Sequence, residues 1–291
     1  MKEMVELIFI ILFLFLAVFL SGCINQPTNQ TAPYVKDIIV IENYEISDST
    51  IYNGSSATLR FTVKNKGKET VEKVKLTFFN LGGFKNYNLK CYKAEIKDSE
   101  CIFYNLKSGE DREVKLEVFA PDIVPPSGAG IPVNFFVEYD VSRKAQAVIP
   151  IIDKTLLTKP LASFSSTQFG DGPIKFEFKL AEASYGEKAI PFKVEMLLTD
   201  IGTYTNKKTP KIPAGNIVLT VYKLSKTSPC PHFDDSYKST KELFLNPSDS
   251  LYCFFKSEDF EGSELDVLIE ATYNYTYTFF RTQSFTIKPM G

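Results

Sequence analysis

The sequence predicts an all-β protein with two sandwich domains behind an exported N-terminal segment. β-branched and aromatic residues, including 25 Phe and 15 Tyr, fill the apolar runs, which favours strands over helices. Apolar and polar residues alternate in many short runs, and 291 residues exceed one typical sandwich. The charge is nearly balanced, with 33 Lys and Arg against 35 Asp and Glu, so no global field favours nucleic acid as a partner.

The N-terminus has the pattern of a secretory signal. Residues 4–20 form an apolar run that follows Lys2 and ends before the small residues Ser21 and Gly22. Residues 1–22 are therefore predicted to be a signal peptide or a membrane anchor, and both alternatives place the rest of the chain outside the cell.

The sequence LSGC at residues 20–23 resembles the lipobox of prokaryotic lipoproteins. This resemblance implies that Cys23 is lipidated and becomes the mature N-terminus, so that membrane lipid is one partner and the protein sits on the extracytoplasmic face of the cell membrane. The alternative is an uncleaved anchor of about 17 residues, with Cys23 unmodified.

Residues 23–36 are predicted to be a tether between the membrane and the folded part. They are polar, contain Pro27 and Pro33, and follow neither the strand nor the helix period. At about 3.3 Å per extended residue, such a tether spans a few tens of ångströms at most.

The remaining four cysteines fit an exported chain with two local disulfides. Three pairings are open from the sequence, but the two close pairs lie in separate halves, which favours Cys91 with Cys101 and Cys230 with Cys253. These spacings differ from those of zinc ligands, and His232 is the one histidine of the chain. We therefore expect no metal and no cofactor.

The first sandwich is predicted over residues 37–154. Its strands show strict alternation, as in SATLRFTVKN, where Leu59, Phe61 and Val63 share one face. Turn signals such as residues 65–67 separate the runs. The alternating runs are residues 56–65, 72–79, 112–119, 131–141 and 144–151.

The second sandwich is predicted over residues 173–291, after a Ser-, Thr-, Gly- and Pro-containing linker at residues 155–172. Its alternating runs follow a comparable order, which indicates a divergent duplication; the alternative is two unrelated all-β domains. These runs are residues 173–181, 189–202, 216–224 and 268–287.

About seven short strands in each half, separated by regular turns, are typical of an immunoglobulin-like sandwich, with a barrel as the alternative. Roughly residues 37–80 also resemble the cell-adhesion-related repeats of prokaryotic surface proteins, and residues 172–224 resemble them more weakly. The resemblance implies an immunoglobulin-like adhesive or accessory module, and it names no ligand.

No catalytic residue is predicted. A nucleophile mechanism needs a base within hydrogen-bond reach, and His232, beside Asp234 and Asp235, is the one histidine available. The sequence has no G-x-S-x-G elbow around a serine, so a solvated loop histidine is favoured.

Two further clusters have a functional and a structural interpretation. The acidic run from Glu258 to Asp266, with Asp259, Glu261 and Glu264, suggests a calcium loop, but its spacing favours a solvated turn. Tyr273, Tyr275 and Tyr277 share one face of an extended segment, where they stack on sugar rings or, as the favoured alternative, pack in the core. Three sequons mark candidate glycosylation sites at Asn29, Asn53 and Asn274.

The sequence thus predicts a membrane-anchored extracellular protein with a non-catalytic binding, adhesion or envelope-organising role. Its partner is expected to be another surface protein or a glycan, held by the loops at residues 82–101, 201–215 and 225–245. The alternative is an accessory carbohydrate-binding or hydrolase-associated subunit, which a pocket with a strongly perturbed carboxylate would favour.

Overall fold

The described part of the chain is built from strands. The computed structural model describes residues 35–152, 165–180, 192–227, 230–246, 248–257 and 264–290, which contain strands β1–β18 and one 3₁₀ turn, η1 (Leu81–Gly83). The predicted all-β fold is confirmed. No helix in these ranges is long and apolar enough to cross a membrane. The predicted signal, Cys23 and Asn29 lie outside the described residues.

One large sheet forms the centre of the compact unit that begins at Val35. Its strand order is β14-β18-β9-β4-β7-β6, with β10 added to β9 and β2 added to β18. The strands are β14 (Ile217–Tyr222), β18 (Glu264–Lys288), β9 (Ala129–Ile152), β4 (Val71–Phe79), β7 (Glu100–Leu106), β6 (Glu95–Lys97), β10 (Ser165–Phe169) and β2 (Thr50–Tyr52).

Two four-stranded sheets and a two-stranded sheet complete the fold. The first has the order β1-β3-β8-β5, the second β11-β12-β17-β15, and the small one pairs β13 with β16. Their strands are β1 (Ile39–Ile46), β3 (Ser56–Asn65), β8 (Asp111–Phe119), β5 (Asn86–Cys91), β11 (Ile174–Leu180), β12 (Phe192–Asp200), β17 (Leu251–Ser257), β15 (Leu224–Thr227), β13 (Lys211–Ile212) and β16 (Leu243–Phe244).

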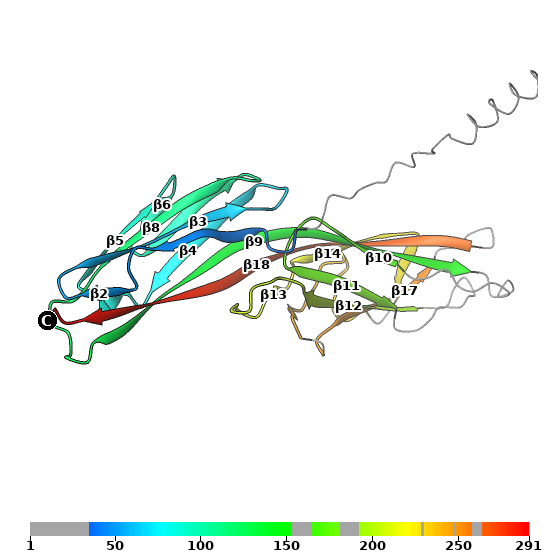
Figure 1. The fold of residues 1–291 in the computed structure, drawn as a ribbon. Coiled ribbons are helices and arrows are strands. Elements are labelled where there is room, and N and C mark those ends of the chain that lie inside the picture. Colours follow the sequence, from blue (N-terminus) through cyan, green and yellow to red (C-terminus); the bar gives the residue numbers. More distant parts are fainter. Residues whose placement is uncertain are drawn as a thin grey trace, which may run out of the picture. The chain divides into compact units, whose positions relative to one another are not determined.

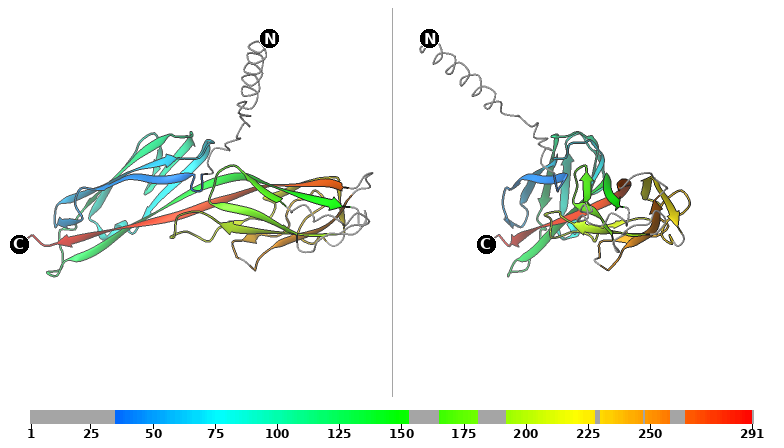
Figure 2. Two further views of the ribbon diagram at one scale, coloured as in Figure 1. Left: turned by 45° about the vertical axis from the view of Figure 1, so that its right-hand side comes forward. Right: turned by 90° about the vertical axis from the view of Figure 1, so that its right-hand side faces the viewer.

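Strands β9 and β18 pair without interruption along their whole length. The antiparallel register runs from Glu264 opposite Ile152 to Ile287 opposite Ala129, and the two strands stay side by side in every view (Figures 1 and 2). The sequence predicted two strands, residues 131–141 and 144–151, where the structure has β9 alone. The alternation continues because Arg143 occupies an inward position that the sequence did not identify as buried.

Both four-stranded sheets cover the same face of the large sheet. Every odd-numbered residue of β9 from Val133 to Ile151 is buried, as are those of β18 from Val267 to Phe279. Between the first four-stranded sheet and the large sheet, the ring of Phe61 stacks on Phe135 at a centroid distance of 4.8 Å. Between the second four-stranded sheet and the large sheet, the ring of Phe176 of β11 stacks on that of Tyr273 of β18 at 5.1 Å. The fold is therefore two β-sandwiches that share one sheet.

Strand pairing crosses the predicted domain boundary. The last part of β18 pairs with residues 129–140 of β9 and, in parallel, with β2, so the C-terminal strand completes the first sandwich. Residues 165–169 of the predicted linker form β10, which pairs with β9. The division into residues 37–154 and 173–291 stays a prediction. The large sheet, however, forms one layer of both sandwiches.

Candidate binding groove at the middle of the large sheet

The large sheet narrows to two strands at its middle. Strand β4 pairs with β9 up to Tyr139, and β10 joins the same edge of β9 only at Lys144. On the other side, β14 pairs with β18 up to Tyr273. Around residues 140–143 the sheet is therefore reduced to the β9–β18 ribbon, which leaves a gap beside it.

A groove of about 560 Å³ occupies this place. Its floor includes the exposed side chains of the ribbon, and one wall is the turn that leads into β4. The lining combines polar and apolar side chains, and a volume of this size suits a small molecule or a segment of an oligomer. Its polar lining includes Glu69, Glu72, Asp140, Ser142, Asn274 and Thr276.

A buried arginine fixes the turn beside the groove. The guanidinium of Arg143, which is 2% exposed, donates to the carbonyl oxygens of Gly170 at 2.6 Å, Gly172 at 3.2 Å and Ile174 at 2.6 Å. These bonds fix the turn before β11 against β9. A Cβ at Gly172, where φ is 142°, would meet the hydroxyl oxygen of Tyr275 at 3.0 Å, so the close approach requires glycine.

The chain enters the described unit beside this turn. The backbone N–H of Val35 donates to Oδ1 of Asp171 at 3.0 Å, and the carbonyl of Val35 accepts from the N–H of Gly172 at 2.9 Å. Asp171 also accepts a hydrogen bond of 2.8 Å from the backbone N–H of Lys68 in the groove wall. Val35 is therefore fixed beside the middle of the large sheet.

The first part of the predicted binding loop at residues 201–215 packs against the inner face of the ribbon. Both the backbone N–H and the hydroxyl of Thr203 donate to the buried carboxylate of Asp37, and Tyr204 stacks on Phe279 at 3.8 Å. A Cβ at Gly202 would lie 2.8 Å from Cβ of Pro173. Pro210 and Ile212 are the buried residues of this loop, and most of its other side chains are exposed, so its role in recognition stays a prediction.

The aromatic run of β18 also faces the core. Tyr273, Tyr275 and Tyr277 are 0%, 3% and 0% exposed, which confirms the core interpretation and excludes them as a sugar-stacking face. Burial and the nearby carboxylates of Asp200 and Asp37 raise the pKa of Tyr277 above its usual value. Phe280, which is 38% exposed, points to the opposite face of the sheet.

The four described cysteines form the two predicted pairs. Cys91 of β5 is joined to Cys101 of β7, with 6.2 Å between the Cα atoms, and so links the two layers of the first sandwich. Cys230 is joined to Cys253 of β17, with 4.4 Å between the Cα atoms.

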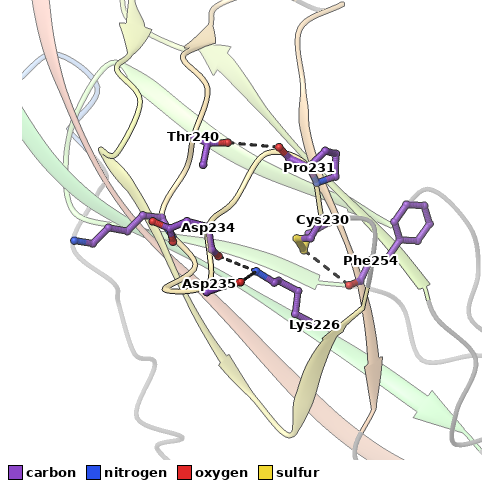
Figure 3. Close-up of a disulfide and its surroundings, with 9 residues drawn as sticks. Lys226, Cys230, Pro231, Asp234, Asp235, Thr240 and Phe254 are labelled. Carbon is purple, nitrogen blue, oxygen red and sulfur yellow. Dashed lines mark hydrogen bonds and ion pairs between the residues drawn. A yellow bond between two sulfur atoms is a disulfide. The ribbon is translucent and has the colours of Figure 1, made fainter.

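The loop at residues 225–245 is tied down around the second disulfide. The ammonium group of Lys226 donates to the carbonyl oxygen of Asp234 at 2.8 Å and pairs with the carboxylate of Asp235 (Figure 3). Oδ1 of Asp234 accepts the backbone N–H groups of Ser236 and Lys238. These polar groups therefore form hydrogen bonds within the loop itself.

His232 lies in this loop with its ring edge-on to Tyr252, at a centroid distance of 4.8 Å. Burial, with Lys241 nearby, lowers the pKa of His232. The buried serine of the same loop, Ser239, accepts the backbone N–H of Gly215 at 3.1 Å. Both side chains thus have structural contacts that favour the non-catalytic interpretation of the loop.

The remaining predicted sites have mixed outcomes. In the loop at residues 82–101, the structure places η1, β5 and β6. The side-chain amide of Asn53 donates to the carbonyl oxygen of Asp122 and accepts the N–H of Met290, whereas Asn274 is exposed in the groove. Glycosylation at these sequons stays a prediction.

The acidic run has no described arrangement as a whole. Glu258, Asp259 and Glu261 lie outside the described residues, and Glu264 and Asp266 begin β18. In the part of the chain that the structure does describe, no three His, Cys, Asp or Glu side chains gather closely enough to hold a metal ion. The calcium hypothesis stays a prediction.

Comparisons with known proteins do not identify a family. No family model and no curated protein matches the chain. Among solved structures, a protein that "catalyzes macrocyclization in alchivemycin A biosynthesis" is 10% identical, with a TM-score of 0.22 over 47% of this chain and 90% of that one. The secreted serine protease VesC of Vibrio cholerae is 12% identical, with a TM-score of 0.22 over 87% and 52%. The collagen-binding adhesin ACE of Enterococcus faecalis is 8% identical, with a TM-score of 0.21 over 89% and 98%. At such scores these similarities carry no argument about function.

Proposed function

We propose that this chain is a membrane-anchored, extracytoplasmic protein that binds a partner and catalyses no reaction. The observation that carries the proposal is the groove at the middle of the large sheet, beside the turn that Arg143 fixes through its hydrogen bonds. A preformed concave surface reduces the conformational entropy that the protein loses on binding, and so favours recognition of a partner.

Two carboxylates of the large sheet, those of Glu100 and Glu270, are stabilised in their ionised form by neighbouring side chains. A hydrogen bond from Lys75 lowers the pKa of Glu100, and hydrogen bonds from Gln146 and Lys144 lower that of Glu270. A general acid for glycoside cleavage needs the opposite displacement, a raised pKa. These carboxylates are therefore suited to ion pairs and to hydrogen bonding with a ligand.

Anchoring through Cys23 is tested in the producing cells. We expect a Cys23→Ala variant to leave the membrane fraction, and we expect the membrane-bound wild type to carry the mass of attached lipid. Thr31→Ala, in the predicted tether, serves as the control and stays with the membrane. A wild-type protein of unmodified mass that remains in the membrane would support the uncleaved anchor instead.

The groove is tested by site-specific photo-crosslinking of the full chain in its native membrane. A photoreactive residue at Ser142, which is exposed in the groove, is compared with one at Ser127, an exposed serine in the turn before β9. We expect a reproducible adduct at position 142 and none at 127. Equal labelling at both positions, or no adduct at 142 across growth conditions, contradicts a binding role for the groove.

A further inference from the structure

The outward face of β18 carries a long row of uncharged polar side chains. The eight outward positions from 272 to 286 are occupied by five Thr, one Ser, one Asn and Phe280. At about 3.4 Å per residue, this row is roughly 48 Å long. It runs along the face of the large sheet that neither four-stranded sheet covers.

The outward faces of the other sheets are charged and ion-paired. Arg60 of β3 pairs with Glu113 of β8 at 3.2 Å. On the other small sheet, Lys175 pairs with Glu177 at 3.0 Å. Threonine is a good strand former, but strand propensity alone does not explain a lack of charge, because the exposed strands just named use Lys, Arg and Glu. The uncharged row is therefore a local property of β18.

Three hydroxyl groups of this row donate hydrogen bonds to side chains of β9, and one of them, that of Thr278, reaches Oε2 of Glu138 at 3.5 Å. Thr276 donates to Oδ1 of Asp140 at 2.6 Å, and Thr282 donates to Oδ1 of Asn134 at 2.7 Å. Since these three hydroxyl protons are directed at β9, the lone pairs of their oxygen atoms remain available to accept hydrogen bonds from a ligand. A ligand rich in hydroxyl donors fits this arrangement.

Three phenylalanine rings interrupt the polar surface at one place. Phe280 lies opposite Phe136 in the β9–β18 register and is 38% exposed. Phe79 of β4 is 39% exposed, and its ring centroid is 5.7 Å from that of Phe136. We call these three residues the aromatic patch. Exposed aromatic rings can stack against the C–H face of a sugar ring, while the neighbouring polar groups bind its hydroxyls.

The row also leads into the groove. Asn274 and Thr276 belong to both, so the polar surface is continuous along β18 from the groove to the aromatic patch. The groove adds four carboxylates, of Glu69, Glu72, Asp140 and Asp171, and one ammonium group, that of Lys68. The carboxylates can accept hydrogen bonds from hydroxyl groups, and the net negative charge repels anions.

We infer that this surface binds an extended neutral polysaccharide. The surface consists of the aromatic patch, the uncharged row and the groove. The inference rests on the proposed function and names its ligand class. The side chains of the uncharged row cannot form ion pairs with a polyanion, and the carboxylates of the groove repel it. Rings and oriented hydroxyls, in turn, match an uncharged, hydroxyl-rich polymer.

The probes are the polysaccharides of the producing organism's own envelope, separated by anion exchange into a neutral and an anionic fraction. Binding of the full chain in detergent is measured by affinity electrophoresis through gels that contain either fraction. We expect the neutral fraction to retard the wild type and the anionic fraction to leave its mobility unchanged. No retardation by the neutral fraction, or stronger retardation by the anionic one, overturns the inference.

Matched double variants locate the surface. Thr278→Lys with Thr282→Lys places two charges in the row, four residues apart, and should weaken retardation by at least about tenfold, since each site loses a hydrogen-bonding hydroxyl and gains a charge that the ligand must desolvate. Thr58→Lys with Thr62→Lys makes the same changes four residues apart on the outward face of β3, and should leave binding unchanged. Phe280→Ala removes one ring and should weaken binding without adding charge.

The outcomes separate this inference from the proposed function. A protein adduct at position 142 without polysaccharide retardation would retain the proposed binding role and overturn the polysaccharide ligand. Equal loss of binding in both double variants would indicate a general charge effect and would also overturn it. Circular dichroism of each variant checks that the strand content is kept.

Discussion

The guanidinium of Arg143 donates a hydrogen bond of 2.6 Å to the carbonyl oxygen of Ile174, and this contact fixes the second small sheet against the large one. Ile174 begins β11, whereas Arg143 lies at the middle of β9, where the sheet has only two strands. A single buried side chain thus joins the two layers beside the groove.

Replacing Arg143 with Leu should lower the free energy of unfolding by roughly 3 to 5 kcal/mol, because three buried carbonyl oxygens lose their donor. Urea unfolding measures the change. Lys144→Leu is the control: its side chain is 56% exposed and pairs with Glu270, so it should change stability by about 1 kcal/mol or less. Similar losses in both variants would contradict the role assigned to Arg143.

Phe61→Ala should cost about 3 to 5 kcal/mol of stability, because the ring is fully buried and stacks on Phe135 across the layers. Phe79→Ala removes a ring of the same kind that is 39% exposed, and its smaller effect provides the comparison. Thermal or urea unfolding of both variants checks the difference. Equal effects would argue against Phe61 as a core contact between the sheets.

The two sandwiches should unfold together, because β9 and β18 run through both of them. Hydrogen exchange followed by mass spectrometry in increasing urea tests this, with β3 reporting on the first sandwich and β12 on the second. We expect both strands to lose protection at the same urea concentration. Separate losses would support the independent domains that the sequence predicts.

Stability should fall as the pH is lowered below about 5. The folded-state pKa values of Glu100 and Glu270 lie below the ordinary 4.5, because Lys75 hydrogen-bonds Glu100, and Gln146 and then Lys144 hydrogen-bond Glu270. The unfolded chain therefore binds more protons in this range, so the stabilisation is complete above 4.5 and is lost as the pH falls through the lowered values.

Urea midpoints between about pH 6 and pH 3 measure this dependence. Glu270→Gln removes one of the titrating groups and should make the fall in stability with acid shallower. An unchanged slope in that variant would show that Glu270 does not contribute. Stability that rises on acidification would contradict the sign of the argument.

Local features of the fold were predictable from the sequence because they depend on neighbouring residues. Alternation at Leu59, Phe61 and Val63 identified β3 and its buried face. The separation of the cysteines by 10 and 23 residues indicated the two pairs that the structure contains.

The groove and the exposed row were not predictable in the same way. Their residues come from segments far apart in the chain, such as Asp140 and Thr276, which become neighbours only through the β9–β18 register. The alternation in β18 showed that tyrosines and threonines lie on opposite faces, but it could not say which small sheets would cover the tyrosines.

The sequence by itself determined an extended, alternating chain with two local disulfides, since side-chain period and cysteine spacing are properties of short segments. Tertiary structure alone decided that Arg143 is buried and that β9 continues through it. From the sequence alone, a charged side chain is expected to be exposed to solvent. Arg143 can be buried because the fold brings the carbonyl groups of Gly170, Gly172 and Ile174 close enough to replace its hydrogen bonds to water.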